Sequence, residues 1–132
     1  MKISFFGAAQ TVTGSRFVIE YNNQRVMIDC GLFQGIKEMR NHNWEPFVQA
    51  ENIDYLILTH AHIDHSGYIP KLVREGFKGK IFCTESTKAL CEILLPDSGR
   101  LQEEDARFAN MTKHSHHDPA LPLYTEMDAI AS

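Results

Sequence analysis

Three histidines and one aspartate fall within six consecutive residues, directly after a short apolar run. The apolar run covers residues 53–58, which is too short for a helix and is typical of a strand buried on both faces. The segment that follows reads Thr59-His60-Ala61-His62-Ile63-Asp64-His65-Ser66-Gly67. Imidazole nitrogens and carboxylate oxygens are donors that suit zinc and similar divalent ions. The sequence therefore predicts a metal site at the end of a buried strand.

The spacing within this cluster predicts two metal positions rather than one. In a turn that leaves a strand, His60 and His62 can point to one side, while Asp64 and His65 reach a second point nearby. A single histidine at a strand end is more often an ordinary hydrogen-bonded residue than a ligand. Four ligand-type groups packed this closely would be costly to bury without a metal. We therefore take all four as candidate metal ligands, and Asp64 also as a candidate catalytic residue.

Asp29 is the second candidate catalytic residue. It follows the apolar segment 25–28 and precedes Gly31, so its carboxylate lies where a strand opens into a loop. One interpretation is that Asp29 orients a metal-bound histidine. The other is that it is an ordinary turn aspartate. The residues alone leave both interpretations open.

The order of the apolar segments predicts a mixed sheet. Short strands are expected over residues 3–8, 16–21, 25–28, 53–58 and 80–83. Asn22 and Asn23 favour a hairpin turn, because asparagine tolerates positive φ. Antiparallel strands followed by strand, helix, strand and helix favour an α/β sandwich with most of its sheet on the N-terminal side.

The remaining segments are expected to be helices and loops. Helical spacing over 69–73 ends at Gly76, as at a C-cap. A second helical pattern covers 86–111, and its interruption at Pro96 should kink or split it. Residues 31–49 are expected to form a long loop with one helical turn. Thr125 should cap a last short helix.

Composition bounds the class of protein but not its substrate. At 132 residues and 43% apolar, the chain suits one small globular domain. A net charge of −4 gives no sign of a basic nucleic-acid surface, although a bound metal could supply positive charge locally. Cys30, Cys83 and Cys91 have no paired spacing and indicate reduced, structural thiols. Reduced thiols fit a cytoplasmic protein, and no signal peptide or membrane span is visible.

Several stretches resemble the metallo-β-lactamase superfamily and, more narrowly, its β-CASP ribonuclease branch. The cluster His60-x-His62-x-Asp64-His65 is similar to the signature of the superfamily, and Asp29 falls where that family has its first acidic motif. The resemblance to the ribonuclease branch runs along essentially the whole chain and is carried by Phe6-Gly7-Ala8-Ala9, Val12-Thr13-Gly14-Ser15, Ile28-Asp29-Cys30-Gly31-Leu32-Phe33-Gln34-Gly35, residues 58–67, and Leu101-Gln102-Glu103-Glu104-Asp105-Ala106.

The resemblance implies a fold, a cofactor and a reaction. The fold would be part of an αββα sandwich with a mixed sheet. His60 and His62 would bind one zinc ion, and Asp64 and His65 a second. A hydroxide that bridges the two ions would attack an RNA phosphodiester, because two metals lower the pKa of bound water and neutralise the charge on the phosphorane. The partner would then be RNA, and the negative net charge would not count against it.

The chain departs from the family after its first ligands. In the family, a later histidine completes one metal, a later aspartate bridges both, and a further histidine lies near the C-terminus. Neither these ligands nor the β-CASP insertion has a counterpart here. We therefore expect residues 1–132 to be the N-terminal part of a metallo-β-lactamase domain, inactive or weakly active alone. The spacing of His114, His116 and His117 is motif-like, but their polar, proline-flanked context favours a solvated loop over metal binding.

Other charged and aromatic residues are predicted to have ordinary roles. Arg100, Arg107 and Lys113 favour a solvated helix face over an RNA track. His42 and Trp44 lie in the long loop, and nothing in their spacing requires a place at the mouth of the site.

Two alternative functions remain open at this level. The first is a metallo-β-lactamase hydrolase that acts on a small ester, thioester, lactone or phosphoester. The stretches beginning at Gly7 and Gln102 argue against it, because they resemble the ribonuclease branch. The second is a non-catalytic module that associates with itself, because unpaired sheet edges and exposed apolar faces favour association. The second alternative predicts homo-oligomers.

Overall fold

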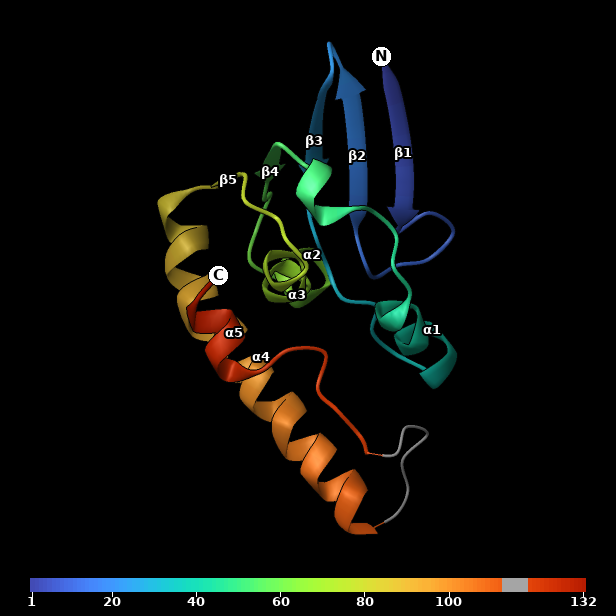
Figure 1. Cartoon of the computed structure of the whole chain (residues 1–132), viewed down its shortest axis with the longest axis vertical. Coiled ribbons are helices and arrows are strands. Elements are labelled where there is room, and N and C mark those ends of the chain that lie inside the picture. The colour runs from blue at the N-terminus through green and yellow to red at the C-terminus, as the bar shows by residue number, and fades with distance from the viewer. Residues whose placement is uncertain (113–118) are drawn as a thin grey trace.

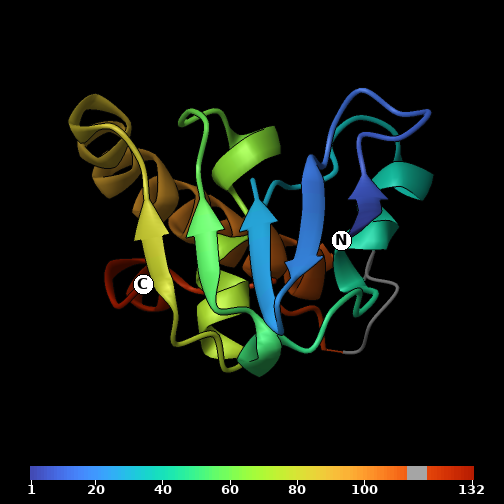
Figure 2. The same ribbon diagram turned by 90° about the horizontal axis from the view of Figure 1, so that it is seen from above.

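The described part of the chain forms one five-stranded mixed sheet in the order β1-β2-β3-β4-β5 (Figures 1 and 2). The structure is a computed structural model that describes residues 1–112 and 119–132. Its strands are β1 (Lys2–Gly7), β2 (Arg16–Tyr21), β3 (Gln24–Ile28), β4 (Tyr55–Ile57) and β5 (Lys80–Phe82). The first three strands pair antiparallel, whereas β4 and β5 join in parallel. The predicted mixed sheet is confirmed.

The β2–β3 hairpin turns through Asn22 and Asn23, whose φ angles are 48° and 61°. Two central residues with positive φ match the right-handed twist of the strands, and asparagine adopts this conformation more readily than most residues. Tyr21 pairs directly with Gln24, so the loop has only these two residues. The sequence therefore fixes the hairpin register, and with it the place where β3 ends.

The helices cover one face of the sheet, as Figure 2 shows for α3, α4 and α5. Their bounds are α1 (Lys37–Asn41), η1 (His42–Trp44), η2 (Ala50–Asn52), α2 (Ile63–Ser66), α3 (Ile69–Arg74), α4 (Glu85–Thr112) and α5 (Glu126–Ile130). Val18, Met27 and Leu56 lie in register across β2, β3 and β4 and are almost fully buried, as are Ile69 and Leu72 of α3. The core therefore lies between the sheet and this helix layer.

The opposite face of the sheet is apolar and open. One register row crosses all five strands through Phe5, Phe17, Ile28, Ile57 and Phe82. Phe5 is 62% exposed and Phe82 51% exposed. Within the described residues, the fold is thus one sheet with one helix layer, which amounts to half of a two-sheet sandwich.

The sequence predicted a kink or a split at Pro96, and the helix is not split, because α4 runs unbroken from Glu85 to Thr112. Proline removes one backbone donor, but packing against the C-terminal segment favours a continuous helix. The side chain of Gln102 accepts a hydrogen bond from the backbone N–H of Leu123, and that of Glu103 accepts one from Glu126. At Gly99 the absence of a side chain lets the backbone before α5 come close to the helix.

Two other local predictions, the C-cap at Gly76 and the N-cap at Thr125, are confirmed. Gly76 has a φ of 116° just after α3, as a helix C-cap requires. Thr125 caps α5 in a capping box with Asp128. These hydrogen bonds, led by that from the Thr125 backbone, hold the pKa of Asp128 below its usual value. In the part of the chain that the structure describes, no helix is long and apolar enough to cross a membrane.

Candidate metal centre

The candidate site lies where two parallel strands end. Asp29 directly follows β3, and the segment beginning at Thr59 follows the neighbouring β4. The backbone N–H of Asp29 donates to the carbonyl of Ile57 at 2.9 Å. The hydrogen bonds between β3 and β4 therefore extend one residue beyond the end of β3. Because the carboxyl ends of parallel strands meet at one edge of a sheet, side chains 30 or more residues apart come together here.

Asp29 is 3% exposed, and three donor groups of the site contact its carboxylate. Its Oδ1 accepts from the Thr59 backbone N–H at 2.8 Å, and the Thr59 hydroxyl lies 2.9 Å from both carboxylate oxygens. Its Oδ2 lies 2.7 Å from Nδ1 of His65. An ionised carboxylate can only accept, so Nδ1 of His65 donates to it, and in a neutral imidazole Nε2 then keeps its lone pair.

The φ of Asp29 is +56°, a conformation that aspartate and asparagine tolerate better than other residues with a side chain. This backbone turn allows the carboxylate to face back toward Thr59 and His65. Asp29 therefore contacts a candidate metal ligand directly, as the first of the two interpretations of this residue requires.

Three consecutive carbonyl groups of the short helix α2 accept hydrogen bonds from the loops beside it. The acceptors are Ile63, Asp64 and His65, and the donors are Leu32 at 3.0 Å, Ser15 at 2.9 Å and Cys30 at 2.7 Å. A helix of four residues has little intrinsic stability. These backbone hydrogen bonds therefore fix the position of Asp64 and His65.

Gly31 allows the close approach between the loop after β3 and α2. A Cβ atom at this position would lie 1.6 Å from the carbonyl oxygen of Asp64 and 2.7 Å from the backbone nitrogen of His65. Both neighbours are backbone atoms, which cannot rotate out of the way. Only glycine fits here without displacing the segment that carries the cluster.

The four predicted metal ligands gather at this edge of the sheet. The His60 ring lies 4.1 Å from the His65 ring and 4.7 Å from the His62 ring, measured between centroids. Oδ2 of Asp64 lies 3.5 Å from Nε2 of His65. Nδ1 of His60 lies 3.0 Å from the Thr59 hydroxyl, so its Nε2 is the nitrogen left for a ligand.

The donor chemistry of this cluster suits a zinc-type ion, but the described residues do not form a complete site. Across residues 1–112 and 119–132, no group of three or more His, Cys, Asp or Glu side chains is arranged to hold one ion. His114, His116 and His117 lie outside the described residues. His42 lies apart from the cluster, with Nδ1 3.2 Å from Glu45.

Sequence reasoning did not identify Thr59 and Arg16 as parts of the site. Thr59 stands beside the histidines in the sequence, and a hydroxyl next to a ligand cluster is the signal that could have singled it out. Arg16 gives no such signal, because a lone arginine in a strand normally faces solvent. In the structure it is 1% exposed.

Arg16 joins the turn after β3 to the loop that carries η1. Its Nε donates to the carbonyl of Gly31 at 2.8 Å, and its Nη2 donates to Oδ1 of Asn43 at 3.1 Å. The guanidinium carbon lies 4.2 Å from the centroid of the Tyr68 ring and 4.4 Å from that of Phe47. Burial lowers the pKa of Arg16. Aromatic faces and carbonyl oxygens thus surround this buried cation and hold the two loops together.

The chain belongs to the metallo-β-lactamase superfamily, because a profile of the Metallo-beta-lactamase superfamily matches residues 11–119. The protein named Ribonuclease TTHA0252 from Thermus thermophilus is 46% identical over 105 residues, which cover 79% of this chain and 24% of that protein. Cleavage and polyadenylation specificity factor 73 of Drosophila melanogaster is 32% identical over 133 residues, covering 100% of this chain and 18% of that protein. The resemblance to the β-CASP ribonuclease branch is confirmed by these relatives.

A solved structure supports the fold alone. The metallo-β-lactamase with a HARLDQ motif from Cronobacter sakazakii aligns with a TM-score of 0.50 at 18% identity, over 68% of this chain and 31% of that chain. The predicted fold class, a partial metallo-β-lactamase sandwich with a mixed sheet, is therefore confirmed. The chain spans about a quarter or less of the length of the two curated relatives named above.

Proposed function

We propose that this chain supplies the first metal ligands of a ribonuclease that hydrolyses RNA phosphodiester bonds. The observation that carries the proposal is the contact of 2.7 Å between Asp29 and Nδ1 of His65, in a cluster with two further histidines. A histidine that binds a metal almost always donates its second ring N–H to a carboxylate, a backbone carbonyl or water, and this contact has that form. The relatives support RNA as the substrate, since one is named a ribonuclease and another a cleavage and polyadenylation factor.

Zinc is the proposed cofactor, with His60 and His62 as ligands of one ion and Asp64 and His65 as ligands of a second. Two bound zinc ions would lower the pKa of a water molecule and neutralise the charge that develops on the phosphate. Each ion would need further ligands from outside the described cluster. We therefore expect the chain by itself to have weak hydrolytic activity or none.

The chain's own residues would orient the ligands. Asp29 holds the proton of His65 on Nδ1, so that Nε2 faces the cluster. Thr59 holds the Asp29 carboxylate through both its backbone N–H and its hydroxyl. Because the carbonyls of Ile63, Asp64 and His65 on α2 accept hydrogen bonds from the neighbouring loops, these contacts would hold Asp64 and His65 in place before any ion or substrate binds.

A chimera tests the proposed reaction. The segment of Ribonuclease TTHA0252 that matches this chain would be replaced by the corresponding residues of this chain, and cleavage of a fluorescent single-stranded RNA would be measured with added zinc. We expect the chimera to cleave RNA, and His62→Ala to reduce the rate at least a thousandfold. His42→Ala is the matched control, since His42 lies outside the cluster, and should leave the rate within twofold.

The same chimera separates the alternatives. It would be offered a β-lactam and a thioester alongside the RNA. Hydrolysis of a small substrate without RNA cleavage would contradict the ribonuclease proposal and favour a hydrolase of small esters or thioesters. A folded, zinc-loaded chimera that hydrolyses none of these substrates would contradict a hydrolytic function altogether.

The open face of the sheet supports association of the chain with a second copy. Its apolar row crosses all five strands, and Phe5, Ile57 and Phe82 are each more than 40% exposed. Multi-angle light scattering would detect the proposed homo-oligomer, and a strict monomer would exclude it. A cytoplasmic location is also proposed, supported by Cys30, Cys83 and Cys91, all of which are free thiols.

A further inference from the structure

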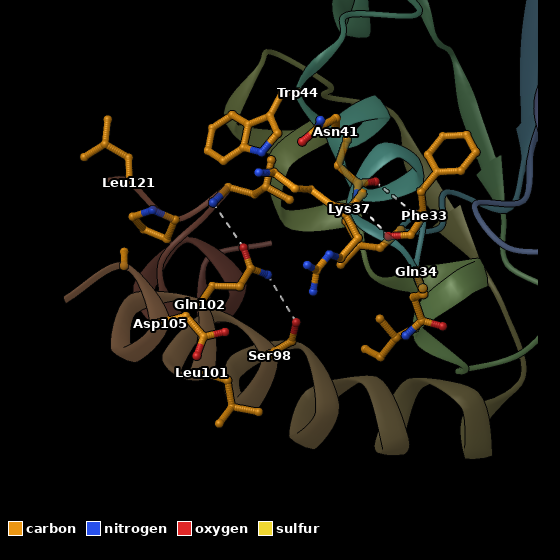
Figure 3. Close-up of a pocket in the computed structure, with 18 of the residues that line it drawn as sticks. Phe33, Gln34, Lys37, Asn41, Trp44, Ser98, Leu101, Gln102, Asp105 and Leu121 are labelled. Carbon is orange, nitrogen blue, oxygen red and sulfur yellow. Dashed lines mark hydrogen bonds between the residues drawn. The ribbon is translucent and has the colours of Figure 1, made fainter. Parts of the chain in front are cut away.

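A pocket of about 710 Å³ lies between the loop carrying α1 and η1 on one side and α4 with the segment before α5 on the other. Figure 3 shows Trp44 and Leu121 toward one end of this pocket, Phe33 and Gln34 toward the other, and Lys37 between them. A pocket of this size accommodates a ligand such as a nucleotide. None of the four candidate metal ligands lines it.

The α1 wall carries two cations that have no acidic partner within residues 1–112 and 119–132. Lys37 and Arg40 are exposed, lie three residues apart and line the pocket. Among the described residues, neither side chain takes part in an ion pair or a hydrogen bond. By contrast, Arg100 on α4 is paired with both Asp97 and Glu104. Two unpaired cations on the wall of a pocket favour an anionic group such as a phosphate.

Trp44 gives the same wall an aromatic surface. Its side chain is 42% exposed. Trp44 ends the 3-10 helix η1, which is held in place by hydrogen bonds of its neighbour Asn43. Its neighbour Asn43 is buried and exchanges two hydrogen bonds with the backbone of Phe33, both at 2.8 Å, while it also accepts from Arg16. An indole held in this way is a preformed platform on which a base can stack.

The α4 wall offers hydrogen-bond acceptors rather than cations. Asp105 lines the pocket, is exposed, and has no partner among the described residues. Gln102 is fully engaged, since its amide donates to Ser98 and its oxygen accepts from Leu123. A ligand with an anionic end and a hydrogen-bond donor, as in a nucleotide with an exocyclic amine or ribose hydroxyls, matches these two walls.

The pocket adjoins the segment that carries the metal cluster. Ile63 lines it, and Ile63 lies between His62 and Asp64 in the sequence. The carbonyl of Ile63 accepts a hydrogen bond from Leu32, another lining residue, at 3.0 Å. The pocket and the candidate metal ligands therefore share the α2 segment.

We propose that this pocket binds one nucleotide of a single-stranded RNA, with its phosphate against Lys37 and Arg40 and its base on Trp44. The proposal rests on the ribonuclease function proposed above. It adds a substrate-positioning site that lies outside the metal cluster.

Trp44 is the only tryptophan in the chain, so its fluorescence reports directly on the pocket. The full 132-residue chain would be titrated with AMP, adenosine, inorganic phosphate and a hexa-adenylate RNA in EDTA, so that neither metal nor cleavage takes part. We expect saturable quenching by AMP, at least tenfold tighter than by adenosine or phosphate. The hexamer should bind at least tenfold tighter than AMP.

Charge-reversal variants locate the contact. Lys37→Glu and Arg40→Glu should each raise the Kd of the hexamer at least tenfold and reduce its dependence on salt. Lys78→Glu is the matched control, because Lys78 is exposed and lies outside the pocket, and it should change the Kd less than twofold.

Each remaining outcome would overturn the proposal. Hexamer binding that the Lys37 and Arg40 variants leave unchanged would place RNA on another surface. AMP binding as tight as hexamer binding would indicate a free-nucleotide site instead of an RNA contact. Absence of saturable quenching would show that the pocket takes no nucleotide. Because the titration contains no metal and no reaction, these results leave the proposed hydrolase to be judged by the chimera.

Discussion

Replacing Gly31 with alanine is expected to lower the free energy of unfolding by about 3 kcal/mol or more, at the upper end of what overpacking costs. The new Cβ would lie 1.6 Å from the carbonyl oxygen of Asp64, so the loop or α2 must move. Either movement breaks the hydrogen bonds from Cys30 and Leu32 to the α2 carbonyls. Urea unfolding followed by circular dichroism measures the loss.

Gly35→Ala is the matched control for this prediction. Gly35 lies in the same loop with a φ of +97°, and a Cβ there would meet nothing within 4 Å. Its replacement should therefore cost only the strain of a left-handed backbone, about 1–2 kcal/mol. If Gly31→Ala unfolds at the same urea concentration as the unsubstituted chain, the close packing of this loop on α2 is not what holds the cluster.

Asp29→Asn is expected to weaken zinc binding by about 10- to 100-fold while leaving the fold intact. Asparagine tolerates the positive φ at this position, and its oxygen can still accept from Thr59. Its amide nitrogen, placed where Oδ2 now lies, would donate to Nδ1 of His65. The proton of His65 would then move to Nε2, and the lone pair that a metal needs would be lost.

Asp29→Ala separates the effect on the metal from the effect on folding. Alanine removes the acceptor for the Thr59 N–H, the Thr59 hydroxyl and Nδ1 of His65, and it disfavours positive φ. We expect a loss of about 2–4 kcal/mol in the free energy of unfolding, from unpaired buried donors and backbone strain. Isothermal titration with zinc and urea unfolding would be run on both variants. Unchanged zinc affinity in Asp29→Asn would leave Asp29 as an ordinary turn aspartate.

Local rules predicted most of the fold because the relevant signals are adjacent in the sequence. Asn22 and Asn23 define a two-residue turn, Thr125 stands three residues before Asp128, and Gly76 follows directly after a helical pattern. The helix α4 shows where such rules fail. Pro96 is unfavourable in a helix, yet the contacts of Gln102 and the space left by Gly99 outweigh it, and these depend on residues more than 20 positions away.

The candidate site could be predicted only in part for the same reason. The four ligand types at residues 60–65 are visible because they are close together in the sequence. The contact of Asp29 with His65 spans 36 residues and follows from β3 and β4 being parallel neighbours. The buried position of Arg16 had no signal, because its partners are carbonyl oxygens and aromatic faces spread over four separate segments. The steric role of Gly31 likewise appears only when α2 packs on its loop.

Zinc titration of the chain and of His62→Ala tests most directly whether residues 60–65 bind metal. His62 is exposed, so its removal should not disturb the fold. His42→Ala controls for the loss of a histidine elsewhere, and a combined replacement of His114, His116 and His117 by alanine tests that segment as the source of ligands. We expect saturable zinc binding that His62→Ala weakens at least tenfold and that the other two variants leave within twofold. Equal zinc binding by the chain and His62→Ala, or no saturable binding by the chain, would contradict the metal site.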